Sequence, residues 1–242
     1  MRNTISAFLL CVGGACAADK GAAPACYPTT IDASRCDPAS VTFTLASTNR
    51  YYPLSVGARV VLEGVDEDDQ GNPVAVRVER TVLAETRMVD GVQTHVLEHK
   101  KFENGSIYEI ARNFYVETTA GDACYFGEDV EFYQNGVLAN TDGTWLAGAG
   151  GAKPGLIMPS MPRVGDAYYQ ENAPGVAEDM GRIVSINAQA TIGGVTYQDV
   201  VEVMDVNPRD GCGSEEPKAY APGVGEVRDV NLRAVSFTPA LR

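Results

Sequence analysis

Hydrophobic and polar residues alternate along much of this chain with a period of two. The alternation is clearest in VAVRVERTV (74–82) and VTYQDVVEV (195–203), where nearly every second residue is apolar. A period of two places successive side chains on opposite faces of a β-strand, and one buried face with one wet face is typical of antiparallel sheets. No segment has sustained helical periodicity, and the best helix candidate is a short turn near 176–184.

Turn residues divide the alternating segments into hairpins. Asp90-Gly91 and Asn104-Gly105 are the strongest short-range hairpin signals in the chain. The strands that we predict are 41–45, 58–63, 74–87, 92–102, 107–118, 124–133, 137–139, 182–192, 195–206 and 225–238. We therefore expect a mainly all-β fold with at most a short helix. Its strands should form a curved antiparallel meander, a half-barrel or barrel that protects the sheet edges.

Residues 143–181 interrupt the alternating pattern. Gly and Pro are too frequent there for a regular strand or helix, yet bulky apolar residues, including the only Trp, are spread through the segment. We expect a long ordered loop that packs against one end of the sheet. Because such loops often carry sites, we predict ligand binding through Trp145, Met158, Met161, Tyr168 and Tyr169.

The N-terminus has the features of a secretory signal peptide. A single Arg precedes a short apolar run, and the small residues up to Ala17 match a signal-peptidase cleavage site. We expect a signal at 1–17, an irregular arm at 18–40 and a single antiparallel domain at 41–242. The apolar run is too short to span a membrane. The predicted location is secreted or periplasmic, with lipoprotein anchoring through Cys16 as the alternative.

The cysteine content supports export. Outside the predicted signal lie Cys26, Cys36, Cys124 and Cys212, an even number without Cys-x-x-Cys spacing or a neighbouring His that would suggest zinc. We predict two disulfides. Four cysteines allow three pairings, and a local bridge between Cys26 and Cys36 within the arm is one of them.

The charge and the missing motifs exclude several classes of function. The formal net charge is −13, and such a chain is repelled by phosphate backbones and anionic lipid surfaces, so we expect no nucleic-acid partner. No nucleophile elbow or nucleotide-binding glycine motif is present, and GAGGAKPG lacks the Lys-Ser/Thr end of a phosphate loop. We predict no cofactor.

Acidic residues beside a Pro-Gly turn are the candidates for chemistry. Glu171, Glu178 and Asp179, together with Tyr168, could perform general acid–base catalysis on a polysaccharide. In an acidic protein, however, such carboxylates more often accept hydrogen bonds from N–H groups of the adjacent loop and fix its shape. We favour this structural role, and polysaccharide-acting catalysis is the alternative.

Metal binding is a further alternative. Met158 and Met161 have the Met-x-x-Met spacing of Cu(I) sites, although Met among aliphatic residues more often fills a core. His95 and His99 lie on one face of a predicted strand, about 13 Å apart, which is too far for one metal ion, and we expect them at the surface or at an interface. The acidic side chains that could bind Ca²⁺ together are Glu128, Asp129, Glu178 and Asp179.

Three blocks of the sequence resemble a known family. They are CYFGEDVEFYQNG (124–136), GTWLAGAGGAKPGLIMPSMPRVGDAYYQENAPGVAEDMG (143–181) and KAYAPGVGEV (218–227). They are similar to a widespread family of secreted bacterial proteins and lipoproteins that has no assigned activity, so the resemblance implies no catalytic residues. YPLSVG (52–57) and YAPGVG (220–225) are loosely similar to periplasmic half-barrels of the LolA type, in which a curved antiparallel sheet wraps an apolar groove.

These observations predict an exported, non-enzymatic binding or structural protein of the bacterial cell envelope. Its expected ligand is a small molecule, a lipid or a glycan on the loop at 143–181. The alternatives are the polysaccharide-acting enzyme, a Ca²⁺- or Cu(I)-binding protein, and a structural protein that assembles into homo-oligomers through its sheet edges.

Overall fold

One antiparallel sheet contains nearly all the regular structure of this protein. The computed structural model describes residues 22–67 and 71–240, so the predicted signal at 1–17 lies outside the described residues. The 15-stranded sheet has the order β10-β11-β12-β13-β14-β15-β2-β3-β4-β5-β6-β7, with β1 paired to β5 and both β8 and β9 paired to β6. The prediction of a curved, all-β antiparallel fold is confirmed. No helix in these two ranges is long and apolar enough to cross a membrane.

The elements follow each other closely along the chain. The first are η1 (Ala33–Cys36), β1 (Phe43–Thr44), β2 (Arg59–Glu67), β3 (Pro73–Val89), β4 (Val92–Glu103), β5 (Ser106–Thr118), β6 (Ala123–Gln134) and β7 (Val137–Asn140). The others are β8 (Trp145–Leu146), β9 (Gly155–Met158), β10 (Ala167–Tyr169), β11 (Met180–Ile192), β12 (Val195–Val206), β13 (Glu216–Ala221), β14 (Gly225–Asp229) and β15 (Leu232–Thr238).

Two-residue turns join the long strands where the sequence predicts hairpins. Asp90 and Gly91 have φ angles of 47° and 76°, and Asn104 and Gly105 have φ angles of 49° and 81°. A tight hairpin of type I′ needs positive φ at both central residues, which Gly adopts freely and Asp and Asn tolerate. The hairpins β3–β4 and β4–β5 therefore form at the predicted turns.

Three segments differ from the predicted strands. β13 lies where no strand is expected. Residues 225–238 form the hairpin β14–β15 instead of one strand, with Val230 at a φ of 49° in the turn. The predicted helical turn near 176–184 is wrong, since β11 already begins at Met180.

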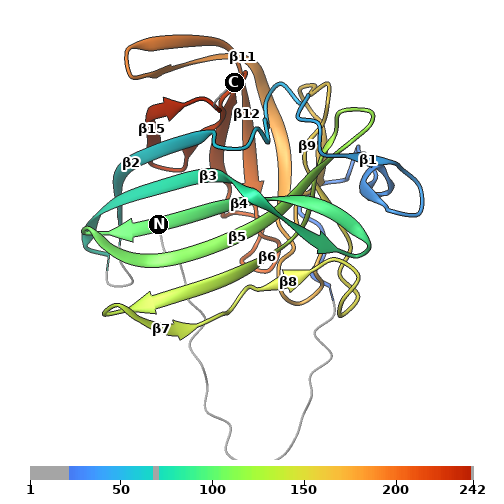
Figure 1. Cartoon of the computed structure of the whole chain (residues 1–242), viewed down its shortest axis with the longest axis horizontal. Helices are drawn as coiled ribbons and strands as arrows, with labels where there is room; N and C mark the ends of the chain where they lie inside the picture. The colour runs from blue at the N-terminus through green and yellow to red at the C-terminus, as the bar shows by residue number, and fades with distance from the viewer. Residues whose placement is uncertain (1–21, 68–70, 241–242) are drawn as a thin grey trace, which may run out of the picture.

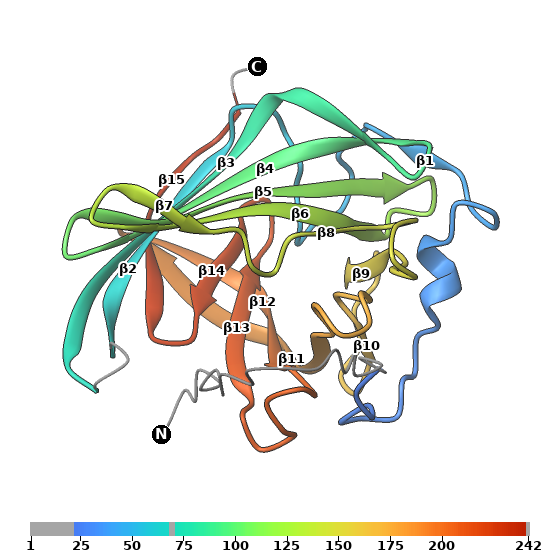
Figure 2. The ribbon, with the colours of Figure 1, turned by 90° about the horizontal axis from the view of Figure 1, so that it is seen from below.

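The sheet bends back on itself and forms two facing layers. Figure 1 shows the long strands wrapping around a central space, and Figure 2 shows β3–β6 as one layer above β11–β14 as the other. The layers are continuous through β15 and β2, which pair with each other. An ion pair between Arg80 of β3 and Glu226 of β14 crosses the space between them. We call the side of the sheet that faces this space its concave face.

The segment 143–181 connects the two ends of the sheet. β8 and β9 pair with β6, whereas β10 pairs with β11. Near β9 and β10, an isolated bridge joins Lys153 to Asn172, and Tyr168 Oη donates a hydrogen bond to the carbonyl of Ile157. A Cβ at Gly155 would lie 2.0 Å from the carbonyl oxygen of Gln170, so only Gly permits this approach. The sheet thus remains open.

Two disulfides fasten the N-terminal arm to the sheet. Cys36 pairs with Cys124 of β6, and Cys26 pairs with Cys212 in the β12–β13 connection. The prediction of two disulfides from these four cysteines is confirmed, and the local Cys26–Cys36 bridge does not form. Main-chain N–H groups of the arm also donate to the carbonyl of Ala167 in β10. Two disulfides indicate an oxidising compartment.

Candidate functional site

Charged side chains lie on the concave face, where an ordinary sandwich would carry apolar ones. On the β3–β6 layer, His99 stands opposite Arg80, and Lys101 stands opposite Glu109. On the other layer, Lys218 of β13 stands opposite Asp229 of β14. Directly opposed residues of neighbouring strands project on the same side of a sheet. Both layers therefore direct charge into the space between them.

We call this set of residues the interior charge cluster. It comprises Arg80, His99, Lys101, Glu109, Glu128, Glu171, Asp179, Asp205, Lys218, Glu226 and Asp229. Acidic members clearly outnumber basic ones. The molecule as a whole has the same excess of acidic residues.

Lys218 lies at the centre of the cluster. Its ammonium group lies deep among protein atoms and forms an ion pair of 2.8 Å with Asp205. The side chain as a whole keeps 26% of its surface exposed. It also acts electrostatically on carboxyl groups from β6, from the β10–β11 connection and from β14. Burial by itself would lower the pKa of Lys218, but Asp205 and Asp229 outweigh it and hold this pKa well above its usual value. Lys218 is thus a permanent cation.

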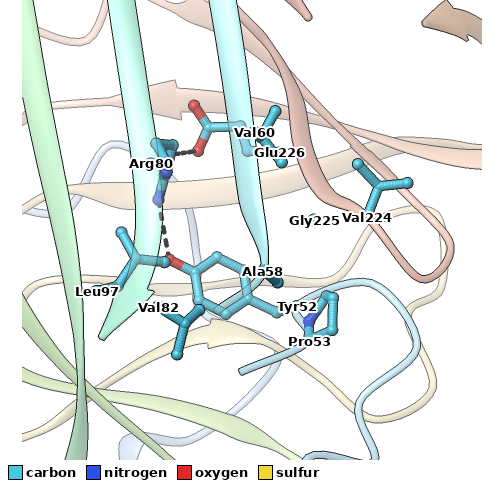
Figure 3. Close-up of a pocket in the computed structure, with 10 residues that line it drawn as sticks. All are labelled: Tyr52, Pro53, Ala58, Val60, Arg80, Val82, Leu97, Val224, Gly225 and Glu226. Carbon is cyan, nitrogen blue, oxygen red and sulfur yellow. Dashed lines mark hydrogen bonds and ion pairs between the residues drawn. The ribbon is translucent and has the colours of Figure 1, made fainter. Parts of the chain in front are cut away.

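A small cavity lies beside the ion pair that crosses the interior. Figure 3 shows the carboxylate of Glu226 and the hydroxyl of Tyr52 on either side of the Arg80 guanidinium, which donates to both. The cavity measures about 30 Å³, and Val60, Val224 and other apolar side chains form its remaining walls. This volume suits about one water molecule. The Arg80 end of the interior is thus closed to larger ligands.

Three partly exposed acids of the cluster influence one another electrostatically, and we call them the carboxyl triad. Glu128 comes from β6, and Glu171 and Asp179 come from the connection between β10 and β11. The main-chain N–H of Glu171 donates to the carbonyl of Asp179 over 3.1 Å, so these two residues lie on neighbouring segments. Burial and the charge of Glu109 raise the pKa of Glu128 to about 8, and burial together with Asp179 raises that of Glu171. Like charges in one site cannot all ionise, so the triad holds protons near neutral pH.

No basic side chain neutralises the triad directly. The ion pairs of the interior, in the ranges described, join Arg80 to Glu226, Lys101 to Glu103 and Lys218 to Asp205. None of these pairs includes Glu128, Glu171 or Asp179. Their side chains remain partly exposed, so the triad is accessible to solvent and lacks its own counter-ion.

His99 is kept neutral by its surroundings. Burial and the nearby Arg80 lower the pKa of its imidazole to about 3, and Lys218 and Lys101 act in the same direction. His95, on the same strand, is buried, and its Nε2 lies 3.0 Å from the carbonyl oxygen of Leu45. The expectation of surface or interface histidines is wrong for His95, because the bend of the sheet encloses this face of β4.

Buried tyrosines underlie the charged groups. Tyr115 stacks on Tyr125 with ring centroids 4.4 Å apart, and Tyr125 Oη donates to Asn113 over 2.6 Å. Tyr220 is fully buried, and its hydroxyl has no hydrogen-bond partner among the described residues. The charged groups that act on this hydroxyl are Glu226, Asp205 and Lys218. It therefore faces the cluster with an unused donor and acceptor.

The five residues predicted to bind a ligand do not gather around one space. Trp145, Met158 and Tyr168 are buried in the main hydrophobic cluster, with 4%, 0% and 1% exposure. Tyr169 is only half-buried, and Met161 is 72% exposed. Met158 is thus buried and Met161 is exposed to solvent, so the two side chains do not form the predicted Cu(I) site.

The acidic residues predicted for catalysis separate into two groups. Glu171 and Asp179 enter the carboxyl triad. Glu178 points the other way: its carboxylate accepts from the main-chain N–H of Ala23 at 3.1 Å and forms an ion pair of 3.5 Å with Arg209. Glu178 thus has the structural role that the sequence favoured. Tyr168, the fourth candidate, is buried away from these acids and hydrogen-bonds to Ile157.

The alternative Ca²⁺ ligands do not converge either. Asp129 pairs with Arg87 on the outer side of the sheet, while the neighbouring Glu128 faces inward. Glu178 is occupied by the arm. In the parts of the chain that are described, no group of three or more His, Cys, Asp or Glu side chains has the arrangement of a metal site.

The sequence alone did not indicate that Arg80, His99 and Lys218 belong to a common site. A signal for Arg80 exists: in VAVRVERTV it occupies the same phase as Val76 and Val78, which are buried. A charged residue in the buried phase of a strand indicates a polar interior. Lys218 carried no comparable signal, because its strand was not predicted.

Comparison of the chain with protein-family models, with curated proteins and with solved structures found no match. Function is therefore inferred from the concave face of the sheet.

Proposed function

We propose that this protein is an exported, non-enzymatic binding protein that holds a small polar ligand on the concave face of its sheet. The observation that carries this proposal is the interior charge cluster, whose acidic members outnumber its basic ones and include partly exposed side chains. Burying charged groups costs several kcal/mol each. A fold that needed only stability would place apolar residues there, so the cluster favours a ligand that uses it.

The same observation distinguishes polar from apolar ligands. In a LolA-type half-barrel the concave face is an apolar groove, whereas here Lys218, Glu128 and Asp205 occupy that face. A lipid chain would remove water from these groups without offering hydrogen bonds in return, which is unfavourable. The two disulfides support the exported location, because they persist in oxidising compartments.

Thermal unfolding with a small set of probes tests this function. We expect at least one polar probe, from 1,4-diaminobutane, glucosamine and glucose, to raise the melting temperature, and decanoate to leave it unchanged. A ligand at one hundred times its Kd adds about 2.7 kcal/mol of stability, which corresponds to about 5–10 °C for a domain of this size. Stabilisation by decanoate alone would instead indicate an apolar site.

A second candidate function is hydrolysis of a polymer, and one contact favours it. The main-chain N–H of Glu171 donates to the carbonyl of Asp179 over 3.1 Å, so these two acids lie on neighbouring segments, and burial together with Asp179 raises the pKa of Glu171. Two carboxyls that share a proton are the arrangement with which aspartic proteases activate water. Release of peptides from casein or of reducing ends from soluble polysaccharides, abolished by Asp179→Asn, would support hydrolysis over simple binding.

A further inference from the structure

The N-terminal arm crosses the side of the molecule on which the sheet is open. At one end of this segment Cys36 is bonded to Cys124 of β6, and at the other end Cys26 is bonded to Cys212 in the β12–β13 connection. Figure 2 shows the arm, in blue, running from the layer of β3–β6 to β10 and β11. We call residues 23–36 the strap, because they join the two ends of the sheet covalently.

The strap covers part of a sheet edge. β10 is the first strand in the order of the sheet and, among the described residues, pairs with β11 alone. On its other side, the carbonyl of Ala167 accepts from the main-chain N–H groups of Thr30 and Ile31 at 2.9 and 3.2 Å, and the N–H of Ala167 donates to the hydroxyl of Thr30 at 2.9 Å. Uncovered main-chain groups at an edge are able to pair with another chain. The strap therefore occupies this position of the β10 edge.

The remaining contacts of the strap lie near the surface. Tyr27 Oη donates to Glu215, and the guanidinium carbon of Arg182 lies 4.8 Å from the centroid of the Tyr27 ring. Every residue from 22 to 35 is exposed or half-buried. Each such hydrogen bond adds little net stability, whereas fixing the backbone of a segment costs conformational entropy at every residue. The position of the strap thus depends strongly on its two covalent ends.

The two disulfides differ in their access to solvent. Cys36 and Cys124 both have 0% exposure, whereas Cys212 is exposed and Cys26 is half-buried. A disulfide opens when a thiolate attacks one of its sulfur atoms, so an exposed bond reacts in the folded protein and a buried bond reacts only after local unfolding. A thiol reagent can therefore reach Cys212 while the fold is intact.

We propose that Cys26–Cys212 is a site of thiol–disulfide exchange with a dithiol reductant, and that its opening releases the strap from β10. One thiolate of the dithiol attacks Sγ of Cys212 and forms a mixed disulfide, while Cys26 leaves as a thiolate and takes up a proton. The second thiolate of the dithiol then displaces Cys212, which is also protonated, and the dithiol becomes an internal disulfide. Two electrons have passed to the protein, and Cys36–Cys124 stays closed.

Release of the strap changes the surface at the end of the sheet. The main-chain groups of Ala167 lose the partners that Thr30 and Ile31 supply. The carboxylate of Glu178 loses the N–H group of Ala23, which donates to it over 3.1 Å. The disulfide thus acts as a lock on the β10 edge, and it does so whether or not the concave face holds a ligand.

Partial reduction of the folded wild-type protein tests the site of exchange. Dithiothreitol is the dithiol, iodoacetamide labels the thiols that it releases, and mass spectrometry of peptides locates the label. We expect Cys26 and Cys212 to be labelled at least about tenfold faster than Cys36 and Cys124, because only the first pair is accessible. Equal rates, or faster labelling of Cys36 and Cys124, would overturn the inference.

Hydrogen exchange of the main-chain amides tests the release of the strap. After selective reduction, the amides of Thr30 and Ile31 should exchange about tenfold faster or more, while amides of β4 keep their protection. The variant Cys26→Ala/Cys212→Ala should show the fast exchange without any reductant, and dithiothreitol should not increase it further. If this variant fails to fold, the selectively reduced wild type is sufficient. Unchanged exchange at Thr30 and Ile31 after reduction would show that the disulfide is not a lock.

Discussion

At the scale of single residues, pairing decides whether a buried charge stabilises this fold or weakens it. Arg80 and Glu226 are nearly inaccessible to solvent, with side-chain exposures of 12% and 5%, and they neutralise each other between the two layers. A buried ion pair adds little stability compared with apolar residues of the same size, but the loss of one partner is costly. Replacement of either residue alone should therefore destabilise the fold much more than replacement of both.

Arg80→Met should destabilise the protein by about 3–5 kcal/mol, because it leaves the Glu226 carboxylate buried without a cation. The double variant Arg80→Met/Glu226→Gln should recover most of this loss, since neither charge remains. Urea unfolding of the wild type, both single variants and the double variant gives the coupling energy directly. Additive losses would show that the two side chains stabilise the fold independently.

Sequence reasoning about single residues succeeded for part of the site and failed for the rest. Glu171 and Asp179 stood out because acids cluster beside a turn, and both reach the triad. Glu178 belonged to the same sequence cluster but faces the N-terminal arm. Adjacent residues of an extended chain point to opposite sides, so a cluster in sequence is not a cluster in space.

At the scale of elements, local turn chemistry made the hairpins predictable. Asp90-Gly91 and Asn104-Gly105 encode their own backbone geometry, so the strands around them follow from a few neighbouring residues. β13 has no such signal: it contains Pro217, and its last three residues are all buried, so its residues do not alternate. The segment 143–181 was predictable as an ordered loop, but its function in linking β6 to β11 depends on long-range pairing.

The two disulfides secure different elements, and their removal should have different effects. Cys36–Cys124 joins η1 to β6 within the main hydrophobic cluster, where both cysteines have 0% exposure. Cys26–Cys212 joins the arm to the β12–β13 connection. On the chain-entropy model each closure contributes about 4–5 kcal/mol, and only the first also fills the core.

Replacing Cys36 and Cys124 by Ala should therefore lower the free energy of unfolding by about 1–2 kcal/mol more than replacing Cys26 and Cys212, because buried volume is lost as well. Guanidinium unfolding of the two double variants, read by circular dichroism, makes the comparison. Equal losses, or a larger loss for the Cys26–Cys212 variant, would show that the arm contributes more to stability than the core contact.

At the scale of the whole molecule, the interior charge cluster should determine how stability depends on pH. The pKa of Glu128 is about 8 in the folded protein and has an ordinary value of 4.5, so the folded state binds more protons between these values. Stability must then fall as pH rises. His99, whose pKa of about 3 lies below its ordinary value of 6.5, acts in the opposite direction, but only below about pH 6.5.

The interval from pH 6.5 to 8 therefore lies outside the opposing effect of His99. We expect the free energy of unfolding to decrease by about 1–2 kcal/mol across this interval, at no more than about 1.4 kcal/mol per pH unit for each group. Glu128→Gln should reduce this slope, whereas Glu85→Gln, which removes an exposed charge on β3, should not. Urea unfolding at three pH values in the interval measures it. A stability that rises with pH would contradict the raised pKa of Glu128.

The two disulfides are nested along the chain, because Cys36 and Cys124 both lie between Cys26 and Cys212. This order affects which disulfides can form first. Synthesis releases the N-terminus first, so the thiols of Cys26 and Cys36 emerge together, well before Cys124 and long before Cys212. Among the four paired cysteines, the nearest oxidation partner of each in that interval is the other, which is the bridge that the native connectivity excludes. Its correction requires thiol–disulfide exchange. We therefore expect a disulfide isomerase, added to an oxidant, to raise the yield of the native connectivity on refolding.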